Sequence, residues 1–135
     1  MTRLALLSLV LLAAHPAEAA RPDAGRIDDR AAILSYVRAR AADAAGQPGL
    51  AAQGYAAALS ASPGDAMLAT RTYRQALTAG DRPLALAAAH ALDAAGALPP
   101  DARLLFVADA ILTKNWAAAR RETAAIRNDG AFGFT

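Results

Sequence analysis

Residues 79–88 read AGDRPLALAA, and this stretch decides the fold because it has the features of a joint between two helices. A glycine readily adopts the left-handed conformation that ends a helix, and a proline fits the first turn of the next helix. The joint recurs every 34 residues, with Gly46, Gly80 and Lys114 at equivalent places. The helices that follow the three joints are predicted to begin at Pro48, Arg82 and Trp116.

The composition favours helices that pack closely. Hydrophobic residues make up 56% of the 135 residues, and alanine alone accounts for about 30%. Alanine has the highest helix propensity but buries little area, so each helix offers only a thin apolar stripe to its neighbours. We therefore predict an all-α chain that is stabilised by stacking. Its helices are expected over residues 30–45, 48–61, 65–79, 82–96, 101–113 and 116–127.

Acidic and aromatic side chains add local expectations to this helical pattern. Aspartate accepts hydrogen bonds from the free N–H groups at a helix start. Asp28 and Asp29 are expected to cap the first helix in this way, and Asp65 and Asp101 to cap two later ones. The aromatic side chains are expected to pack between helices, and Trp116 to wedge against the helix before it; these residues are Tyr55, Tyr73, Phe106 and Trp116.

The residues around the joints resemble the tetratricopeptide repeat (TPR) family, whose unit is a pair of helices that repeats every 34 residues. Ala51, Tyr55 and Ala58 match the small, aromatic and small positions of its second helix, and Pro63 closes the first unit. The resemblance covers residues 32–134 and is weaker in the second and third units. It implies antiparallel helix-pair repeats, a TPR-like α-solenoid of about three units. A generic helical bundle is the alternative.

The first nineteen residues have the pattern of a secretory signal peptide. Arg3 gives a positive start, residues 4–14 form an apolar run that is too short to span a bilayer, and Ala17-Glu18-Ala19 offers a cleavage site. The expected organisation is a signal peptide at 1–19, a flexible lead-in at 20–30 and a TPR-like helical repeat domain at 31–135. The mature chain is then exported to the periplasm, whereas an uncleaved leader would anchor it in the inner membrane.

Composition also limits the chemistry that the chain can perform. The net charge is +2, and the arginines are scattered rather than gathered in a patch, which argues against nucleic-acid binding. The absence of cysteine excludes disulfides and thiolate metal sites. His90 is the only histidine after the leader, and we interpret it as a surface or inter-helix residue. We expect no catalytic residues, no metal and no cofactor, so the chain is predicted not to be an enzyme.

The resemblance implies a binding surface on the first helix of each unit. In the family this concave surface commonly holds a peptide or a partner helix. Arg40 and Arg74 occupy equivalent positions one repeat apart, where two guanidinium groups can take a carboxylate; solvated surface arginines are the alternative. The lysine and asparagine clamp that some family members use is absent. The residues expected to contact a partner are Tyr36, Arg40, Asp43, Thr70, Arg74 and Leu104.

These features together predict a protein–protein interaction scaffold in the cell envelope. Two other interpretations remain open: the docking segment of a longer envelope enzyme or transport accessory, and a membrane-anchored assembly factor. Phe132 and Phe134 resemble the start of another apolar segment. A repeat array requires a terminal helix with a polar outer face. The sequence offers no such helix behind this apolar segment, so we also expect self-association through the C-terminal edge.

Overall fold

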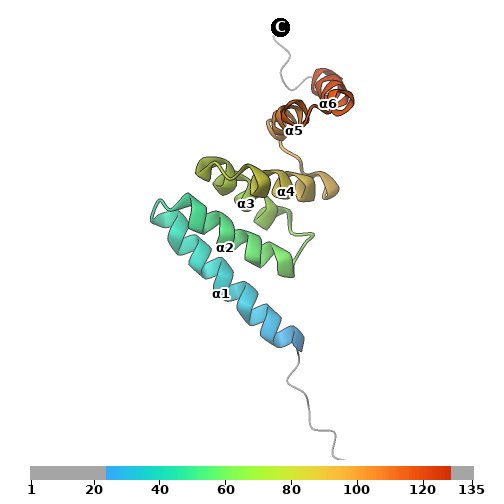
Figure 1. Cartoon of the computed structure of the whole chain (residues 1–135). Coiled ribbons are helices and arrows are strands. Elements are labelled where there is room, and N and C mark those ends of the chain that lie inside the picture. Colours follow the sequence, from blue (N-terminus) through green and yellow to red (C-terminus); the bar gives the residue numbers. More distant parts are fainter. Residues whose placement is uncertain (1–23, 129–135) are drawn as a thin grey trace, which may run out of the picture.

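Six helices and no strand make up the part of the chain that the computed structural model describes, residues 24–128 (Figure 1). The predicted signal peptide and the C-terminal Phe132 and Phe134 lie outside the described residues. The all-α prediction is confirmed, and the second helix of each pair begins at residue 48, 82 or 116, as expected. The helices are α1 Ala24–Ala44, α2 Pro48–Ala61, α3 Ala66–Ala79, α4 Arg82–Ala94, α5 Ala102–Leu112 and α6 Trp116–Asn128.

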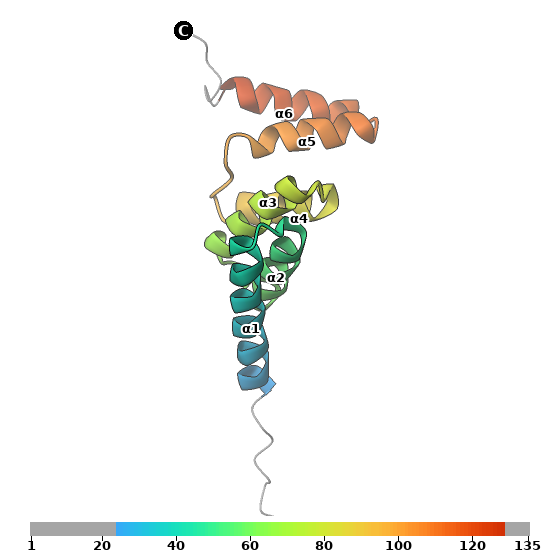
Figure 2. The same cartoon turned by 90° about the vertical axis from the view of Figure 1, so that its left-hand side faces the viewer.

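Consecutive helices form three hairpins that follow one another along the molecule. The pairs are α1 with α2, α3 with α4, and α5 with α6, and α2 also packs along α3. The third hairpin is joined to α4 by the extended segment 95–101 and lies at one end of the molecule (Figure 2). No helix among residues 24–128 is both long enough and apolar enough to cross a membrane.

The turn inside each hairpin has the same backbone geometry. A residue one or two positions after the first helix has a positive φ in all three turns: 67° at Gly46, 73° at Gly80 and 57° at Lys114. The next N–H reaches back five residues to a carbonyl of the helix, as in a Schellman motif. These bonds are 2.9 Å from Gln47 to Ala42, 2.9 Å from Asp81 to Ala76 and 2.7 Å from Asn115 to Ala110. The equivalence of the three joints, expected from the sequence, is therefore confirmed.

Lys114 is a non-glycine residue in a conformation that glycine adopts without cost. A left-handed backbone costs a residue with a Cβ roughly 1–2 kcal/mol. Lys114→Gly is therefore expected to raise the free energy of unfolding by about 1 kcal/mol, measured by urea unfolding. Gly80→Ala, the matched change in the second turn, should lower it by a similar amount. Equal stability of all three chains would contradict this assignment of strain.

Two predicted N-caps had different outcomes. Asp65 caps α3, because its Oδ1 accepts hydrogen bonds from the N–H groups of Met67 at 2.9 Å and Leu68 at 3.0 Å. Asp101 occupies the N-cap position of α5, but its side chain makes no capping bond. It accepts a hydrogen bond from the Tyr73 hydroxyl at 3.0 Å instead. The expected cap at Asp101 was wrong because this carboxylate joins α5 to α3.

The start of the first helix also differs from the prediction. Helix α1 begins at Ala24, so residues 24–30, which were expected to form a flexible lead-in, are helical. Asp28 and Asp29 lie in the second turn of α1 and not at its N-cap. A carboxylate can act as a cap only where the N–H groups lack helical partners, and the helix starts six residues earlier than its apolar pattern suggested.

Alanine dominates the core, as the composition predicts. Twelve of the sixteen buried apolar residues are alanine, so the helices approach closely and each contributes little volume. The larger buried side chains are Tyr55, Leu68, Tyr73 and Leu92. Tyr55 and Leu68 belong to a cluster between α1, α2 and α3, whereas Tyr73 and Leu92 belong to a second cluster that extends to α5.

The aromatic predictions held for three residues and failed for one. Tyr55 and Tyr73 are buried, and Phe106 is half-buried and stacks on His90 with ring centroids 4.7 Å apart. Trp116 does not wedge against the preceding helix: it is 56% exposed. Its ring stands outside the narrow space between α5 and α6, where the buried positions are Ala110 and Ala119. His90 is an inter-helix residue with an exposed edge, as interpreted from the sequence.

Tyr73 couples stability to alkaline pH. Burial, and next the hydrogen bond to Asp101, raise the pKa of Tyr73 to about 12. An unfolded tyrosine titrates near pH 10, so the fold favours the protonated phenol. This contribution is complete below pH 10 and is lost as the pH rises through 12. The shift of about two pKa units corresponds to about 3 kcal/mol.

Tyr73→Phe is therefore expected to change sign in its effect between pH 8 and pH 11.5. At pH 8 the variant lacks one hydrogen bond and should be less stable by about 1 kcal/mol. At pH 11.5 Tyr73 is largely ionised in the unfolded parent chain, whereas the fold holds it protonated. The parent chain therefore loses stability at this pH, and the variant should be the more stable of the two. Urea unfolding of both chains at the two pH values measures this, and a difference independent of pH would refute it.

Candidate functional site

The residues expected to contact a partner meet partly in one pocket between α1 and α3. Asp43 of α1 and Thr70 and Arg74 of α3 line a hollow of about 380 Å³. Its remaining lining residues are Met67, Arg71 and Gln75. We call this hollow, with the adjoining Tyr36 and Arg40, the α1–α3 site. Leu104 is exposed on α5 and does not line the pocket.

Asp43 is the point at which α1, α2 and α3 are tied together. Its Oδ2 accepts a hydrogen bond from the Tyr55 hydroxyl at 3.0 Å, and its Oδ1 accepts one from Gln75 Nε2 at 2.8 Å. Arg40 Nη1 lies 3.6 Å from Oδ2. Both carboxylate oxygens are thus occupied by groups of the chain itself. Asp43 positions its neighbours, and Arg71 and Arg74 line the pocket.

Arg71 is a site residue that the sequence prediction missed. Its guanidinium carbon lies 5.7 Å from the centre of the buried Tyr55 ring, within the range of a cation–π contact. Its Nε is buried and has no hydrogen-bond partner among residues 24–128. A signal was present in the sequence: Arg71 is one repeat from Val37 and Leu105, so a charged residue stands at a place that is apolar in the other two units.

Arg40 and Arg74 lie on neighbouring helices beside this pocket. Both are exposed, and Arg74 makes no ion pair with residues 24–128. The pKa of Arg40 is raised above its ordinary value, first by its side-chain hydrogen bond with Tyr55. Arg40 is therefore a permanent cation. With Arg71 the site holds three guanidinium groups and one carboxylate, a net positive charge of two.

Apolar side chains flank these charges. Met67, one turn before Arg71, and Leu77, just beyond Arg74, are exposed on the same helix. Ile33 of α1 and Leu104 and Ile111 of α5 are exposed as well. Tyr36 is half-buried and packs on Tyr55, with ring centroids 5.9 Å apart. The arrangement can accept a ligand that presents an anionic group between apolar ones.

Thr70 contributes little to polar recognition. Its hydroxyl donates a hydrogen bond to the carbonyl of Ala66 in the same helix at 2.7 Å. A threonine that bonds back to its own helix leaves mainly its methyl group for contact. Thr70 therefore forms an apolar part of the pocket wall.

A second polar pocket, of about 250 Å³, lies where the third hairpin meets α4. Arg82 Nη1 and Asp109 Oδ1 are 2.9 Å apart across this junction, and Arg103 Nη1 lies 3.6 Å from Glu122 Oε2. Carboxylates and guanidinium groups nearly balance here, and their contacts hold α5 and α6 in place. We therefore assign the pocket a structural role.

Comparisons with protein-family models, with curated proteins and with solved structures find no match for this chain.

Proposed function

We propose that the protein is a non-enzymatic interaction scaffold of TPR-like repeats, which binds a peptide or partner helix across its first helices. The observation that carries this proposal is the α1–α3 site, where three arginines and one carboxylate lie beside exposed apolar side chains. Interfaces are typically built from such a combination, with arginine and Met enriched among the contact residues. The ligand that fits best presents a carboxylate one turn away from an apolar side chain.

The three arginines of the site would contribute to binding in different ways. Arg74 makes no ion pair with the described residues, so its guanidinium is available for a bidentate contact with a carboxylate. The guanidinium of Arg71 rests on the Tyr55 ring, which limits the side-chain entropy lost on binding. Arg40 also pairs with Asp43 and adds longer-range attraction.

We propose further that residues 1–19 direct export and are removed, so that the scaffold acts in the periplasm. The support is the order of the positive start, the apolar run and the A-x-A site. The mass of the N-terminal peptide of the protein recovered from the cell envelope tests this proposal. Export with Met1 retained would replace it with the anchored form.

The binding proposal is tested with two synthetic amphipathic peptides that differ only in one residue, glutamate or glutamine, between two leucines. The glutamate peptide should bind at least about tenfold more tightly, since a hydrogen bond to a charged group contributes roughly 1.5–3 kcal/mol and 1.4 kcal/mol is a factor of ten. Arg40→Glu with Arg74→Glu should abolish the preference. Arg120→Glu with Arg121→Glu, the same charge change on α6, is the matched control and should retain it.

Two results would remove the proposal. One is equal affinity of the parent chain for both peptides, because the arginines would then not bind the carboxylate of the glutamate peptide. The other is an equal loss of affinity in the α6 control, because net charge alone would then explain the preference. Recovery of partners from an envelope extract, with the parent chain and the same two variants, extends the test to natural ligands.

A further inference from the structure

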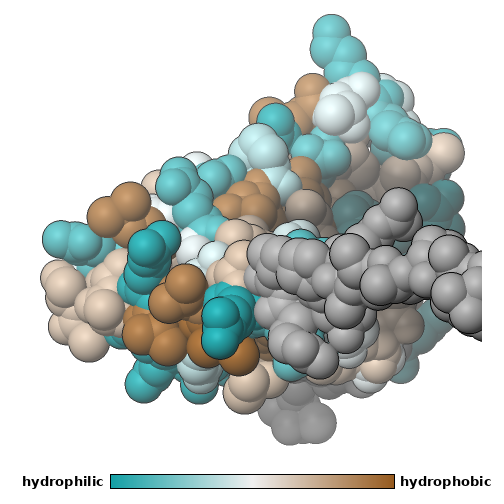
Figure 3. All heavy atoms as spheres, turned by 90° about the horizontal axis from the view of Figure 1, so that it is seen from below, coloured by the Kyte–Doolittle hydropathy of each residue, from teal (hydrophilic) through white to brown (hydrophobic). Residues whose placement is uncertain are grey.

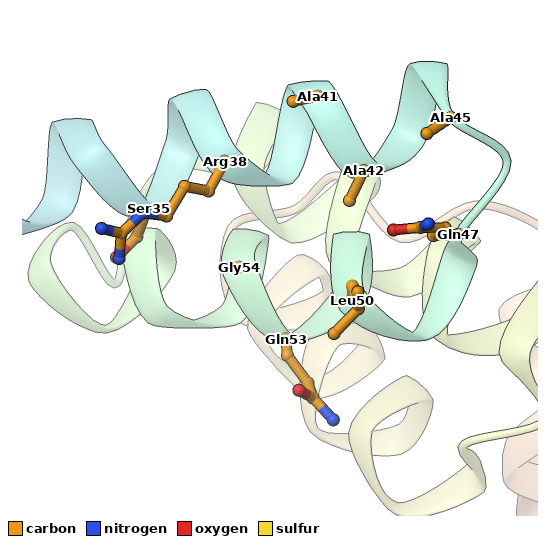
Figure 4. Close-up of a pocket in the computed structure, with 9 residues that line it drawn as sticks. All are labelled: Ser35, Arg38, Ala41, Ala42, Ala45, Gln47, Leu50, Gln53 and Gly54. Carbon is orange, nitrogen blue, oxygen red and sulfur yellow. The ribbon is translucent and has the colours of Figure 1, made fainter.

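A groove runs along the α1–α2 hairpin, on the side of α2 that is turned away from α3. Two hollows of about 650 Å³ each share Ser35 and together extend over most of the hairpin. Figure 4 shows the first of them, with residues of α1 and α2 facing each other across small side chains. Asp28 and Asp29 lie at one end of the groove, and Arg38 lies further along it.

The repeat shows what covers this surface in the other two units. Leu34, Leu68 and Ala102 occupy equivalent places, 34 residues apart. Leu68 is 8% exposed because it packs beside α2, and Ala102 is 0% exposed because it packs against residues of α4, whereas Leu34 is 55% exposed. The end of the molecule at which α1 lies accordingly shows apolar side chains among polar ones (Figure 3). The uncovered face of α1 is the face on which a first helix meets the preceding second helix.

Helix α6 has the complementary surface. On α2, Ala52 and Leu59 pack against the following hairpin. Their equivalents on α6 are Arg120 and Arg127, both exposed, with the exposed Thr123 between them. Among residues 24–128 no first helix follows α6 to cover these positions. The described residues therefore present the repeat positions of both halves of this internal interface, with Arg120 and Arg127 of α6 in place of the alanine and leucine of α2.

We propose that the protein self-associates head to tail, with α6 of one copy lying in the α1–α2 groove of the next copy. In the register of α2 on α3, where Leu59 packs beside Leu68, Arg127 lies beside Leu34. Its aliphatic stem covers that side chain, and its guanidinium extends toward Asp28 and Asp29, about one and a half helical turns from Leu34. The charges are complementary at this end, where the last turn of α6 is basic and the groove is acidic.

The same register places Arg120 near Arg38, since Ala52 packs in a cluster with Ala69 and Tyr73. These like charges oppose association. Two substitutions with the same charge change are thus expected to have opposite effects. Arg127→Glu should raise the dissociation constant about tenfold, and Arg120→Glu should lower it severalfold. Effects of the same sign would exclude this register.

Because the two surfaces differ, the contact does not close on itself, and a copy with both surfaces free can bind two others. Sedimentation velocity should show a mean mass that keeps rising with concentration beyond that of a dimer. Leu34→Arg blocks the groove, and Thr123→Glu with Arg127→Glu blocks α6. All three positions are exposed, so the variants keep the fold, which circular dichroism checks. Leu112→Arg, at a 67% exposed apolar residue outside both surfaces, is the matched control and should associate like the parent.

The decisive measurement mixes the two blocked variants. Each alone should be monomeric, and the mixture should form a dimer that contains one of each and grows no further. A parent chain that stays monomeric at all concentrations would overturn the proposal. A closed dimer that survives either block would also overturn it, because it would reveal a symmetric contact elsewhere. The outcome is independent of the α1–α3 site, whose peptide preference is measured separately.

Discussion

Leu92→Ala is expected to lower the free energy of unfolding by about 3 kcal/mol. Leu92 is fully buried and is the largest aliphatic side chain in a cluster otherwise built mostly of alanine. Removing a buried leucine to alanine costs roughly 2–5 kcal/mol, because the lost transfer free energy is joined by the cost of a cavity.

Leu92 also has a special position along the molecule. Its cluster contains residues of α2, α3, α4 and Ala102 at the start of α5. The variant is therefore expected to loosen the junction with the third hairpin, in addition to the loss in overall stability. Urea unfolding measures the free energy, and hydrogen exchange of α5 and α6 measures the loosening. Leu112→Ala, at an exposed leucine, is the control and should change stability by less than about 0.5 kcal/mol.

Gly54→Ala should destabilise the protein by about 2 kcal/mol, although alanine is the better helix former. A Cβ added at Gly54 would lie 2.8 Å from the Cβ of Ala39 and 3.1 Å from both the Cα of Ala39 and the carbonyl oxygen of Ser35. Two of these three atoms belong to the backbone of α1, so a side-chain rotation cannot relieve the contact. The helices must separate, and overpacking of this kind costs roughly 1–3 kcal/mol.

Gly49→Ala provides the opposite result within the same helix. No atom lies within 4 Å of a Cβ added at Gly49. The propensity gain of roughly 0.5–1 kcal/mol should therefore appear as added stability. Thermal unfolding of the two variants measures effects of opposite sign. If both variants were stabilised, α1 and α2 would not approach as closely as the structure shows.

Gly54 illustrates why local rules did not predict the whole of the fold. From the sequence, a glycine in the middle of an alanine-rich helix only lowers the helix propensity. Its role is visible once α1 lies against it, since the close approach needs a residue without a side chain. The joints between the helices could be predicted from the sequence, because Gly46, Gly80 and the residues around them affect only the adjacent end of their own helix.

The candidate site also combines residues that the sequence predicted with contacts that only the tertiary structure shows. The repeat pattern placed Arg40, Asp43 and Arg74 on the first helices, and in the structure Asp43 and Arg74 line one pocket while Arg40 lies next to Asp43. The pattern did not indicate that Tyr55 and Gln75 hold Asp43, or that the Nε of Arg71 is buried beside an aromatic ring. These contacts join residues 12 and 32 positions apart in the chain, on three different helices.

The sequence by itself determined the helical class, the three joints and the starts of the second helices, because glycine, proline and alanine act on the backbone around them. Only the tertiary structure decided which side chains are covered. Leu34 and Leu68 are the same residue at the same repeat position, yet one is exposed and the other buried. Burial depends on which helix lies alongside, and that neighbour is present for α3 and absent for α1 among the described residues.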